Sequence, residues 1–421
     1  MMLNYIDLEY IPKKNELVTE YFVEPSKDLS LEFASEQIAK ESSIGTWTTI
    51  STMSPKVSKK LKPHVFEIDK SKNIIKIAYP IGLFEKGSLP QLMSSITGNV
   101  YGMKILKNLR LIDVHFPKSY VKSFPGPRYG IEGIRKITGV KNRPLLGTIV
   151  KPKVGLKSKE HAKVAYDAWS GGLDVVKDDE NLTSMSFNKF RKRMDLTFKM
   201  RDKVEKETGE KKIYLANITA PYPEMERRYK YIEKLGGEYA MVDILTIGYS
   251  AVQGVREMGD LALHGHRAMH AALTRNPKHG MSMLFLAKIS RLAGIDQLHI
   301  GTAVGKMHGA KNEIKMIGHE VEDQLIPGDG KNALNQDWYG MNSMMGVSSG
   351  GLHPGLLPDV VNILGKDIVI QFGGGCHGHP DGTKSGAKAI RQACEASMKE
   401  TSLTKYAKDH EELRKALKKW S

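Results

Sequence analysis

Cysteine is nearly absent from this chain, which has only Cys376 and Cys394 among its 421 residues. Two cysteines cannot build the disulfide framework of a small secreted protein, so we expect a reducing compartment. Cys376 lies in the glycine-rich stretch FGGGCHGH (372–379), where a catalytic nucleophile is one interpretation. A small residue in a tight turn is the interpretation that we favour.

Long hydrophobic runs are also missing, because no segment approaches the roughly 20 apolar residues that span a bilayer. The first 16 residues include acidic side chains and lack the apolar core of a signal peptide. We therefore expect a cytoplasmic protein without a membrane partner. Hydrophobic residues make up 40% and charged residues 26%, a balance typical of soluble globular proteins.

Acidic residues are in deficit, since 47 Asp and Glu face 63 Lys and Arg and leave a formal net charge of +16. A nucleic-acid surface is one explanation, and a lysine-rich surface around a site for an anionic small molecule is another. The basic stretches at 56–62, 191–195 and 418–420 are scattered, and no RNA-binding aromatic signature or zinc-finger spacing accompanies them. We favour an anionic substrate and expect no nucleic-acid partner.

The N-terminal part reads as an α+β domain. Residues 15–25 and 73–84 have the pattern of strands, and residues 31–42 have the pattern of a helix. The stretch SFPGPRYG (123–130), rich in proline and glycine, predicts a boundary. We therefore divide the chain into an N-terminal domain, 1–125, and a catalytic domain with C-terminal helices, 126–421.

Eight short apolar runs follow from residue 144, spaced about 30 residues apart and mostly separated by helix-like segments. This alternation predicts an α/β fold, a (β/α)₈ TIM barrel. An open doubly wound sheet is the alternative, but it lacks a GxGxxG after its first strand. The runs are 144–152, 173–179, 213–219, 239–248, 261–266, 297–305, 345–351 and 368–375.

Polar groups stand where these runs end, which is where a barrel builds its active site. Each has a simpler explanation: Asp179 and Glu180 could favour the start of a helix, His299 could be a core histidine, and Lys151 a solvated strand end. Their conjunction favours a site for an anion and a metal. The groups are Lys151 and Lys153; Lys177, Asp179 and Glu180; His264, His266 and Arg267; His299 and Lys306; Ser348 to Gly351; and Gly373 to Gly375.

Residue types suggest the ligands. Backbone N–H groups of glycines after the last two strands commonly bind phosphate in barrels, and a second phosphate could contact Arg267 and His299, which together imply a bisphosphate. Asp179 and Glu180 are hard oxygen ligands suited to Mg²⁺. Lys306 lies in a glycine-flanked loop that could close over substrate. The glycines are Gly350, Gly351, Gly373 and Gly374.

Lys177 contradicts this metal site as it stands. A protonated lysine repels a metal, and its unperturbed pKa near ~10.4 makes it a poor base at neutral pH. Conversion of the lysine to a carboxylate-bearing form would resolve the contradiction, but composition alone cannot establish such a conversion.

The stretch GGLDVVKDDEN (171–181), together with KPKVGL (151–156), closely resembles the large subunit of ribulose-1,5-bisphosphate carboxylase/oxygenase (RuBisCO). This resemblance implies an α+β N-terminal domain followed by a (β/α)₈ barrel. It runs through nearly the whole chain and includes ESSIGTWTTI (41–50), ITGNVYGMK (96–104), HGHRAMHAA (264–272), HIGTAVGKM (299–307), SSGGLHPG (348–355) and QFGGGCHGHP (371–380).

The resemblance also implies roles. Lys177 would be carbamylated by CO₂, would bind Mg²⁺ with Asp179 and Glu180, and would be the base that enolises ribulose 1,5-bisphosphate before CO₂ or O₂ adds. Lys151 would protonate the product carbanion with support from Lys153. His266 would transfer protons, and Lys306 would hold the new carboxylate. Phosphate contacts would be Arg267, His299 and Ser349 at one end, and Thr46, Trp47, Gly351, Gly373 and Gly374 at the other.

Glu41, Thr46, Trp47 and Asn99 belong to the N-terminal domain, and in this family such residues come from the neighbouring chain. The resemblance thus implies an obligate homodimer with two shared sites; whether dimers assemble into larger rings is left open. Ile44 replaces a threonine of plant-like sequences, and the text after Gly351 also departs from them. These departures resemble the archaeal form III group, which has no small subunit and serves AMP and nucleoside salvage.

Two rivals remain. A RuBisCO-like protein would only enolise or isomerise a related sugar phosphate, but such relatives replace several substrate residues that are present here. A basic nucleic-acid-binding scaffold would bind RNA in a salt-sensitive manner whether or not Lys177 is intact.

Overall fold

The computed structural model describes residues 4–48, 50–304, 311–328 and 333–420. The chain separates into two compact units, and each is considered by itself. The first comprises Met1–Gly126, Met269–Ala293 and Asp323–Met341, and the second comprises Pro127–Ala268, Gly294–Glu322 and Asn342–Ser421. The first unit thus includes two later segments that the sequence assigned to the barrel domain.

A five-stranded sheet with the order β10-β4-β1-β3-β2 forms the first unit. Serine hydroxyls cap its first three helices by accepting the backbone N–H of the third residue of each helix. The predicted strands and helix of this region are confirmed, with the second strand ending at Pro80. The strands are β1 (Glu16–Pro25), β2 (His64–Asp69), β3 (Ile74–Pro80), β4 (Leu106–His115) and β10 (Gly280–Met281).

The helices of the first unit are short. They are α1 (Leu31–Glu41), α2 (Pro55–Leu61), α3 (Leu89–Ile96), α4 (Lys118–Val121), α10 (His270–Thr274) and α11 (Met283–Ala293), with the 3-10 turns η1 (Ile81–Leu83) and η2 (Asn99–Gly102). A small antiparallel pair, β12 (Leu325–Ile326) and β13 (Gln336–Asp337), completes the unit.

A closed eight-stranded barrel forms the second unit, in the order β11-β14-β15-β5-β6-β7-β8-β9. All neighbouring strands are parallel, so the predicted TIM barrel is confirmed and the open sheet was wrong. Each strand lies within one of the eight predicted runs. They are β5 (Leu145–Ile149), β6 (Val175–Lys177), β7 (Ile213–Asn217), β8 (Tyr239–Asp243), β9 (Ala262–His266), β11 (Gln297–His299), β14 (Met345–Ser349) and β15 (Ile368–Phe372).

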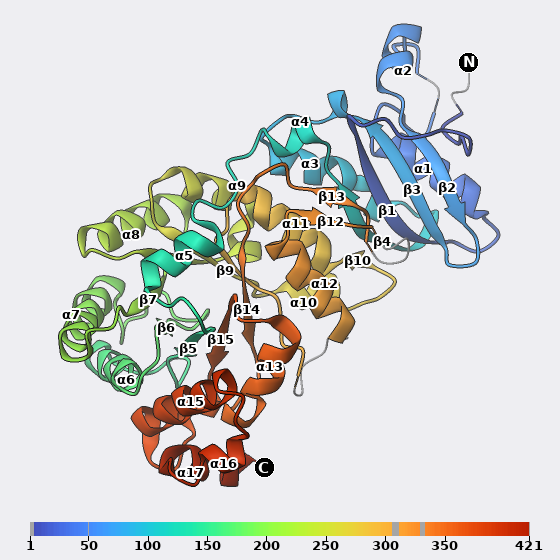
Figure 1. Ribbon diagram of the computed structural model, residues 1–421. Coiled ribbons are helices and arrows are strands. Elements are labelled where there is room, and N and C mark those ends of the chain that lie inside the picture. The colour runs from blue at the N-terminus through green and yellow to red at the C-terminus, as the bar shows by residue number, and fades with distance from the viewer. Residues whose placement is uncertain (1–3, 49, 305–310, 329–332, 421) are drawn as a thin grey trace. The chain divides into compact units, whose positions relative to one another are not determined.

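Helices follow most strands, and α6, α7 and α8 lie around the outside of β5, β6 and β7 (Figure 1). Helix α7 ends at a glycine, because Gly209 is left-handed and its N–H bonds to Glu205 O. The helices are α5 (Gly130–Thr138), α6 (Ser158–Ser170), α7 (Phe190–Thr208), α8 (Tyr222–Lys234), α9 (Ile244–Glu257), α12 (Lys311–Glu322), α13 (Leu357–Leu364), α14 (Gly374–His377), α15 (Gly382–Met398), α16 (Leu403–Tyr406) and α17 (Glu411–Trp420), with η3 (Pro354–Leu356).

The barrel interior is apolar near the strand amino ends and polar near the carboxyl ends. Buried Val175, Leu215, Met241 and Val369 belong to one core cluster, and hydrophobic side chains of α5 pack against it. The next inward position on β6 is Lys177, because side chains alternate along a strand. The polar residues therefore stand on a packed apolar base.

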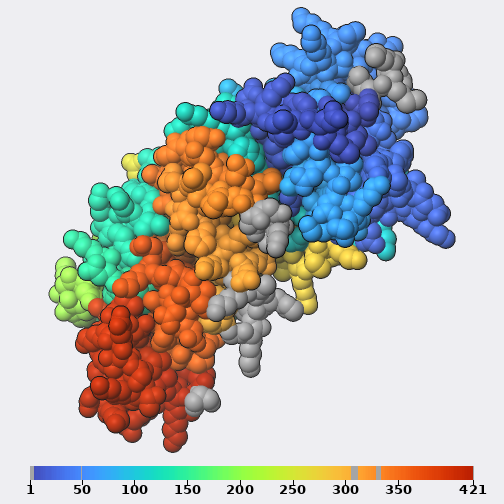
Figure 2. All heavy atoms as spheres, turned by 45° about the vertical axis from the view of Figure 1, so that its right-hand side comes forward, coloured from blue at the N-terminus to red at the C-terminus, as the bar shows by residue number. Residues whose placement is uncertain are grey.

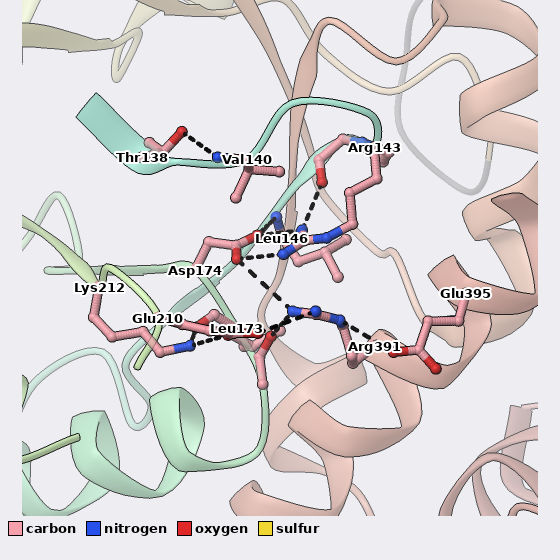
Figure 3. Close-up of polar contacts among 12 residues, drawn as sticks. Thr138, Val140, Arg143, Leu146, Leu173, Asp174, Glu210, Lys212, Arg391 and Glu395 are labelled. Carbon is pink, nitrogen blue, oxygen red and sulfur yellow. Dashed lines mark hydrogen bonds and ion pairs between the residues drawn. The ribbon is translucent and has the colours of Figure 1, made fainter. Parts of the chain in front are cut away.

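An ion-pair network joins the start of β6 to its neighbours (Figure 3). Asp174 is buried and accepts two hydrogen bonds from Arg143, at 2.6 and 2.7 Å, and one from the backbone N–H of Leu146. Arg391 of α15 lies 4.0 Å away and also bonds Glu210 and Glu395. The network ties the starts of β5 and β6 to α15.

The residues that follow β15 form a continuous part of this unit's surface, coloured red in Figure 2. There α15 packs on α17, and Glu412 joins them by accepting hydrogen bonds from Lys388 and Gln392. In the part of the chain that the structure describes, no helix is long and apolar enough to cross a membrane.

Candidate active site at the carboxyl ends of the barrel strands

Two lysines of one loop meet two carboxylates of the next. In the β5–β6 register Ile149 lies opposite Lys177, so the loops after both strands begin side by side. Lys151 Nζ lies 2.6 Å from Asp179 Oδ2, and Lys153 Nζ lies 3.3 Å from Glu180 Oε1. Burial alone would raise the pKa of Asp179, but the hydrogen bonds from Lys151 and Asn181 and the charge of Lys151 together lower that pKa. Both carboxylates are therefore held as anions.

Lys177 is completely buried between these groups and the apolar base. Its Nζ donates to the carbonyl of Asp178 at 2.8 Å and lies 3.4 Å from Met241 Sδ. Burial lowers its pKa, although neighbouring carboxylates oppose the shift. Burial therefore favours the neutral amine of Lys177 more than the surface of a protein would.

The third carboxylate of the motif, Asp178, points away from the site. It is fully buried, pairs with Arg193 at 3.2 Å, and accepts hydrogen bonds from Tyr214 and from the backbone N–H of Asn217. It is a structural anchor for the loop that carries Asp179 and Glu180.

His264 and His266 of β9 each meet the ring of His299 of β11 edge to face. His299 Nδ1 lies 2.9 Å from Ser349 Oγ, and its Nε2 lies 2.9 Å from Nε2 of His264. Burial lowers the pKa of His299 and brings that of His264 to about 3. His264 and His299 are therefore both neutral. The contact between His299 and Ser349 brings together two of the predicted phosphate-binding residues.

His266 has an acidic partner that the sequence analysis missed. Its Nδ1 lies 2.9 Å from Asp243 Oδ1, and its Nε2 lies 3.7 Å from Glu180 Oε2. The sequence held a signal for it, because Asp243 is a polar residue at the end of a strand. The predicted run continued to Gly248, whereas β8 ends at Asp243 and α9 begins at the next residue. Asn217, which ends β7, was missed in the same way and donates to the carbonyl of Glu180 at 3.2 Å.

Arg267 carries a guanidinium with no hydrogen bond or ion pair to any residue that the structure describes. Burial lowers its pKa to about 10. Gly301 makes room for it, because a Cβ there would lie 2.8 Å from Arg267 Nη2. A buried, unpaired cation is costly, so the site suits an anionic ligand.

The predicted glycines follow the adjacent strands β14 and β15, where Ser349 lies opposite Gln371. Gly350 and Gly351 have φ of 116° and 68°, which strongly favours glycine. A Cβ on Gly351 or Gly374 would meet nothing within 4 Å, whereas one on Gly373 would lie 3.4 Å from Lys151 Cε. These turns leave backbone beside open space.

Cys376 follows the glycines but is fully buried, and burial raises its pKa to about 12. It cannot form a thiolate near neutral pH, which excludes the nucleophile, and it lies in the single-turn helix α14 instead of the expected turn.

The first unit brings together its own predicted residues. Glu41, Thr46, Trp47 and Asn99 line one hollow of about 800 Å³, and Asn99 Nδ2 donates to Glu41 Oε1 at 3.4 Å. Trp47 is 88% exposed. Lys306 lies outside the described residues.

The site has part of the ligand set that Mg²⁺ needs. Asp179 and Glu180 supply adjacent hard oxygens, but the described residues contain no group of three or more His, Cys, Asp or Glu side chains placed to hold a metal. The buried neighbour that could complete the set is Lys177, which as an amine offers no oxygen. The residues fit Mg²⁺ if Lys177 gains an oxygen ligand.

Comparisons with known proteins place both parts of the chain in one family. Residues 4–120 match the ribulose bisphosphate carboxylase large chain N-terminal domain, and residues 130–420 match the catalytic domain. Similar proteins include the ribulose bisphosphate carboxylases of Methanosarcina barkeri, 53% identical over 100% of this chain and 99% of that one, and of Methanocaldococcus jannaschii, 52% identical over 99% and 100%.

Two solved structures extend the comparison. Dimeric archaeal Rubisco from Hyperthermus butylicus has a TM-score of 0.94 at 47% identity and covers 99% of this chain and 98% of that one. Octameric Rubisco from Pyrococcus horikoshii has a TM-score of 0.93 at 49% identity, with coverage of 99% and 96%. With both domain models matched and relatives at this identity over its whole length, the chain belongs to the RuBisCO large-chain family.

Proposed function

We propose that this protein is a ribulose-bisphosphate carboxylase that uses Mg²⁺ and a carbamylated Lys177. The observation that carries the proposal is the buried Lys177 amine beside Asp179 and Glu180, at the same end of the barrel as the unpaired Arg267. One half of this arrangement suits a metal and the other suits phosphate.

Lys177 would be modified before catalysis. Its neutral amine would attack CO₂, an N–C bond would form, and one proton would leave to solvent, which converts the amine to a carbamate. The carbamate oxygen, Asp179 and Glu180 would then hold Mg²⁺, and Lys151 would give up its contact with Asp179. When bound, Mg²⁺ supplies Lewis-acid stabilisation of the negative charge that develops on the substrate oxygens.

The chain's own residues would orient ribulose 1,5-bisphosphate and move its protons. Arg267, His299 and Ser349 would hold one phosphate, and the backbone of Gly350, Gly351, Gly373 and Gly374 would hold the other. The Lys177 carbamate would remove the proton that starts enolisation, and His266, oriented by Asp243, would shuttle protons. CO₂ would add to the enolised carbon, and hydration and cleavage would give two 3-phosphoglycerates.

Lys151, steadied by Lys153, would protonate the carbanion that cleavage leaves, and Lys306 would hold the new carboxylate. With O₂ in place of CO₂ the products would be one phosphoglycerate and one phosphoglycolate. Glu41, Thr46, Trp47 and Asn99 would complete the site of a second chain, so the working form would be a homodimer without small subunits. The cytoplasm and archaeal AMP salvage are the proposed setting.

Incorporation of labelled CO₂ into acid-stable product tests the proposal. Protein preincubated with bicarbonate and Mg²⁺ should fix label into 3-phosphoglycerate, and Lys177→Ala and Lys306→Ala should lose this activity. Lys159→Ala, which changes an exposed lysine on α6, is the matched control and should retain it. If the wild type fixes no label but exchanges substrate protons, the protein is an enolising or isomerising relative instead.

A further inference from the structure

A second group of cations lies outside the active site, where α7 and α8 begin. Four basic side chains line a hollow of about 250 Å³ there, together with Ser184, Phe190, Glu224 and Tyr231. Glu224 is the one carboxylate in this lining. The cations are Lys189, Arg191, Arg227 and Arg228. The basic stretch 191–195, which the sequence analysis treated as surface, contributes to this hollow.

The start of α7 has charges of the wrong sign for a helix N-terminus. The first turn of a helix carries partial positive charge and favours Asp or Glu. The first turn of α7 contains no acidic residue, and Lys189 at the N-cap position provides no side-chain cap. The segment instead reads KFRKR (189–193), so cations are added to a site that is already positive.

Arg228 brings a buried guanidinium to the hollow. Its side chain is 8% exposed, and its guanidinium carbon Cζ lies 5.0 Å from the centre of the Phe190 ring. Nε donates to Glu224 at 3.2 Å and Nη1 donates to the carbonyl of Thr219 at 3.0 Å. Nη2 has no hydrogen-bond partner among the residues that the structure describes. A fixed donor that is mostly removed from water therefore borders the hollow.

The carboxylates around the hollow are already engaged. Glu224 is shared by Arg227, at 2.7 Å, and Arg228. Asp195 accepts from the Tyr231 hydroxyl at 2.5 Å, and Glu226 pairs with Lys230 at 2.5 Å. Lys189 and Arg191 form no ion pair with any described residue; Arg191 only stacks over Tyr231 at 5.1 Å. The excess positive charge is thus not balanced by the chain itself.

We propose that this hollow binds one phosphate-type oxyanion, supplied either as inorganic phosphate or as the phosphate group of a small monoester. The Arg228 Nη2 and the Arg191 guanidinium would donate to its oxygens, and the start of α7 would add its partial positive charge. A water molecule takes about 30 Å³ of liquid volume, so the hollow holds one tetrahedral anion with a few waters. The proposal is independent of the carboxylase function, which uses none of these side chains.

Phosphate titration of paired variants tests the site. Lys192 is exposed, occupies the same first turn as Arg191, and does not line the hollow. Arg191→Gln should weaken phosphate binding at this site about tenfold through loss of a charge-assisted hydrogen bond. Lys192→Gln removes the same charge and should leave that affinity within about twofold. Both variants keep the active site, so its own phosphate binding cancels in the comparison.

Binding should be followed by calorimetry at constant ionic strength, with chloride as the balancing anion, and with ribose 5-phosphate as a second probe. Tighter binding of the ester would assign the hollow to a sugar phosphate, and equal binding would assign it to phosphate itself. Crystals soaked in tungstate should show the anion within hydrogen-bond distance of Arg228 Nη2. An empty hollow, or equal phosphate affinity in the two variants, would overturn the proposal. A change in oligomeric mass without anion binding would make it a protein interface.

Discussion

Adjacent carboxylates of one motif have different tasks in this protein. Asp178 and Asp179 differ by one position, yet the first is sealed among Arg193 and Tyr214 while the second faces Lys151. Strand alternation explains the difference, since Lys177 points inward and its neighbour must point outward. The sequence was therefore sufficient to separate these two residues. It was not sufficient to predict that Lys177 is completely buried, because burial depends on side chains from several other strands.

Residue-level burial also predicts how stability depends on pH. His377 is held by contacts to Thr148 Oγ1, the Ile149 carbonyl and Thr383 Oγ1, and burial lowers its pKa from 6.5 to about 4. Between these values the unfolded chain binds more protons than the folded one, so stability falls as pH drops from 6.5 toward 4. This one group should contribute a loss of about 3 kcal/mol.

Urea unfolding at intervals from pH 7 to pH 4.5 measures the effect. His377→Gln cannot take up the proton, so its unfolding free energy should fall less steeply with acidification than that of the wild type. His279→Gln changes an exposed histidine and should follow the wild-type slope. Parallel slopes in all three proteins would show that His377 is protonated as easily in the fold as in the unfolded chain.

At the level of elements, the sequence predicted the barrel but not which segments outside the strands belong to the barrel unit. Each apolar run had the length of a buried strand, and polar residues marked the strand ends. Helix α11 lies between two of the barrel runs in the sequence, but it belongs to the first unit, where it packs on β4. An apolar helix face does not specify its partner, so this grouping needed three-dimensional contacts. Asp243 was missed because its run was extended into the start of α9.

The Asp174 network should be a main support of the barrel elements (Figure 3). Asp174→Asn would leave Arg143 without its buried partner carboxylate and weaken the contact to Leu146 N–H. Loss of one partner from a buried pair costs about 3–5 kcal/mol. Asp202→Asn, which breaks an ion pair on an aspartate side chain that is 52% exposed, should cost less than about 1 kcal/mol. Thermal unfolding of the two variants would contradict this account if both melted at the same temperature.

For the whole molecule, two clusters of predicted site residues lie in two different units. The barrel cluster contains Lys177 and Arg267, and the first unit contains Glu41 and Trp47 around its own hollow. The barrel cluster lacks Thr46 and Trp47, the remaining predicted phosphate contacts, which lie in the first unit. Two relatives are described as dimeric and octameric, and the sharing of each site between two chains is part of the function proposed above. Only the family resemblance suggested this, since no periodicity or charge pattern encodes which chain supplies a residue.

Mixed dimers would decide this point. Lys177→Ala and Glu41→Ala should each be inactive in CO₂ fixation, because each removes one half of every shared site. When equal amounts are dissociated and reassembled together, half of the dimers should be mixed, and one of the two sites in each should be intact. Random pairing thus predicts recovery of about a quarter of wild-type activity in a C₂ dimer. Reassembly of each variant alone is the control and should recover nothing. If the mixture also stays inactive while mixed dimers form, Glu41 and Lys177 of the same chain must build each site.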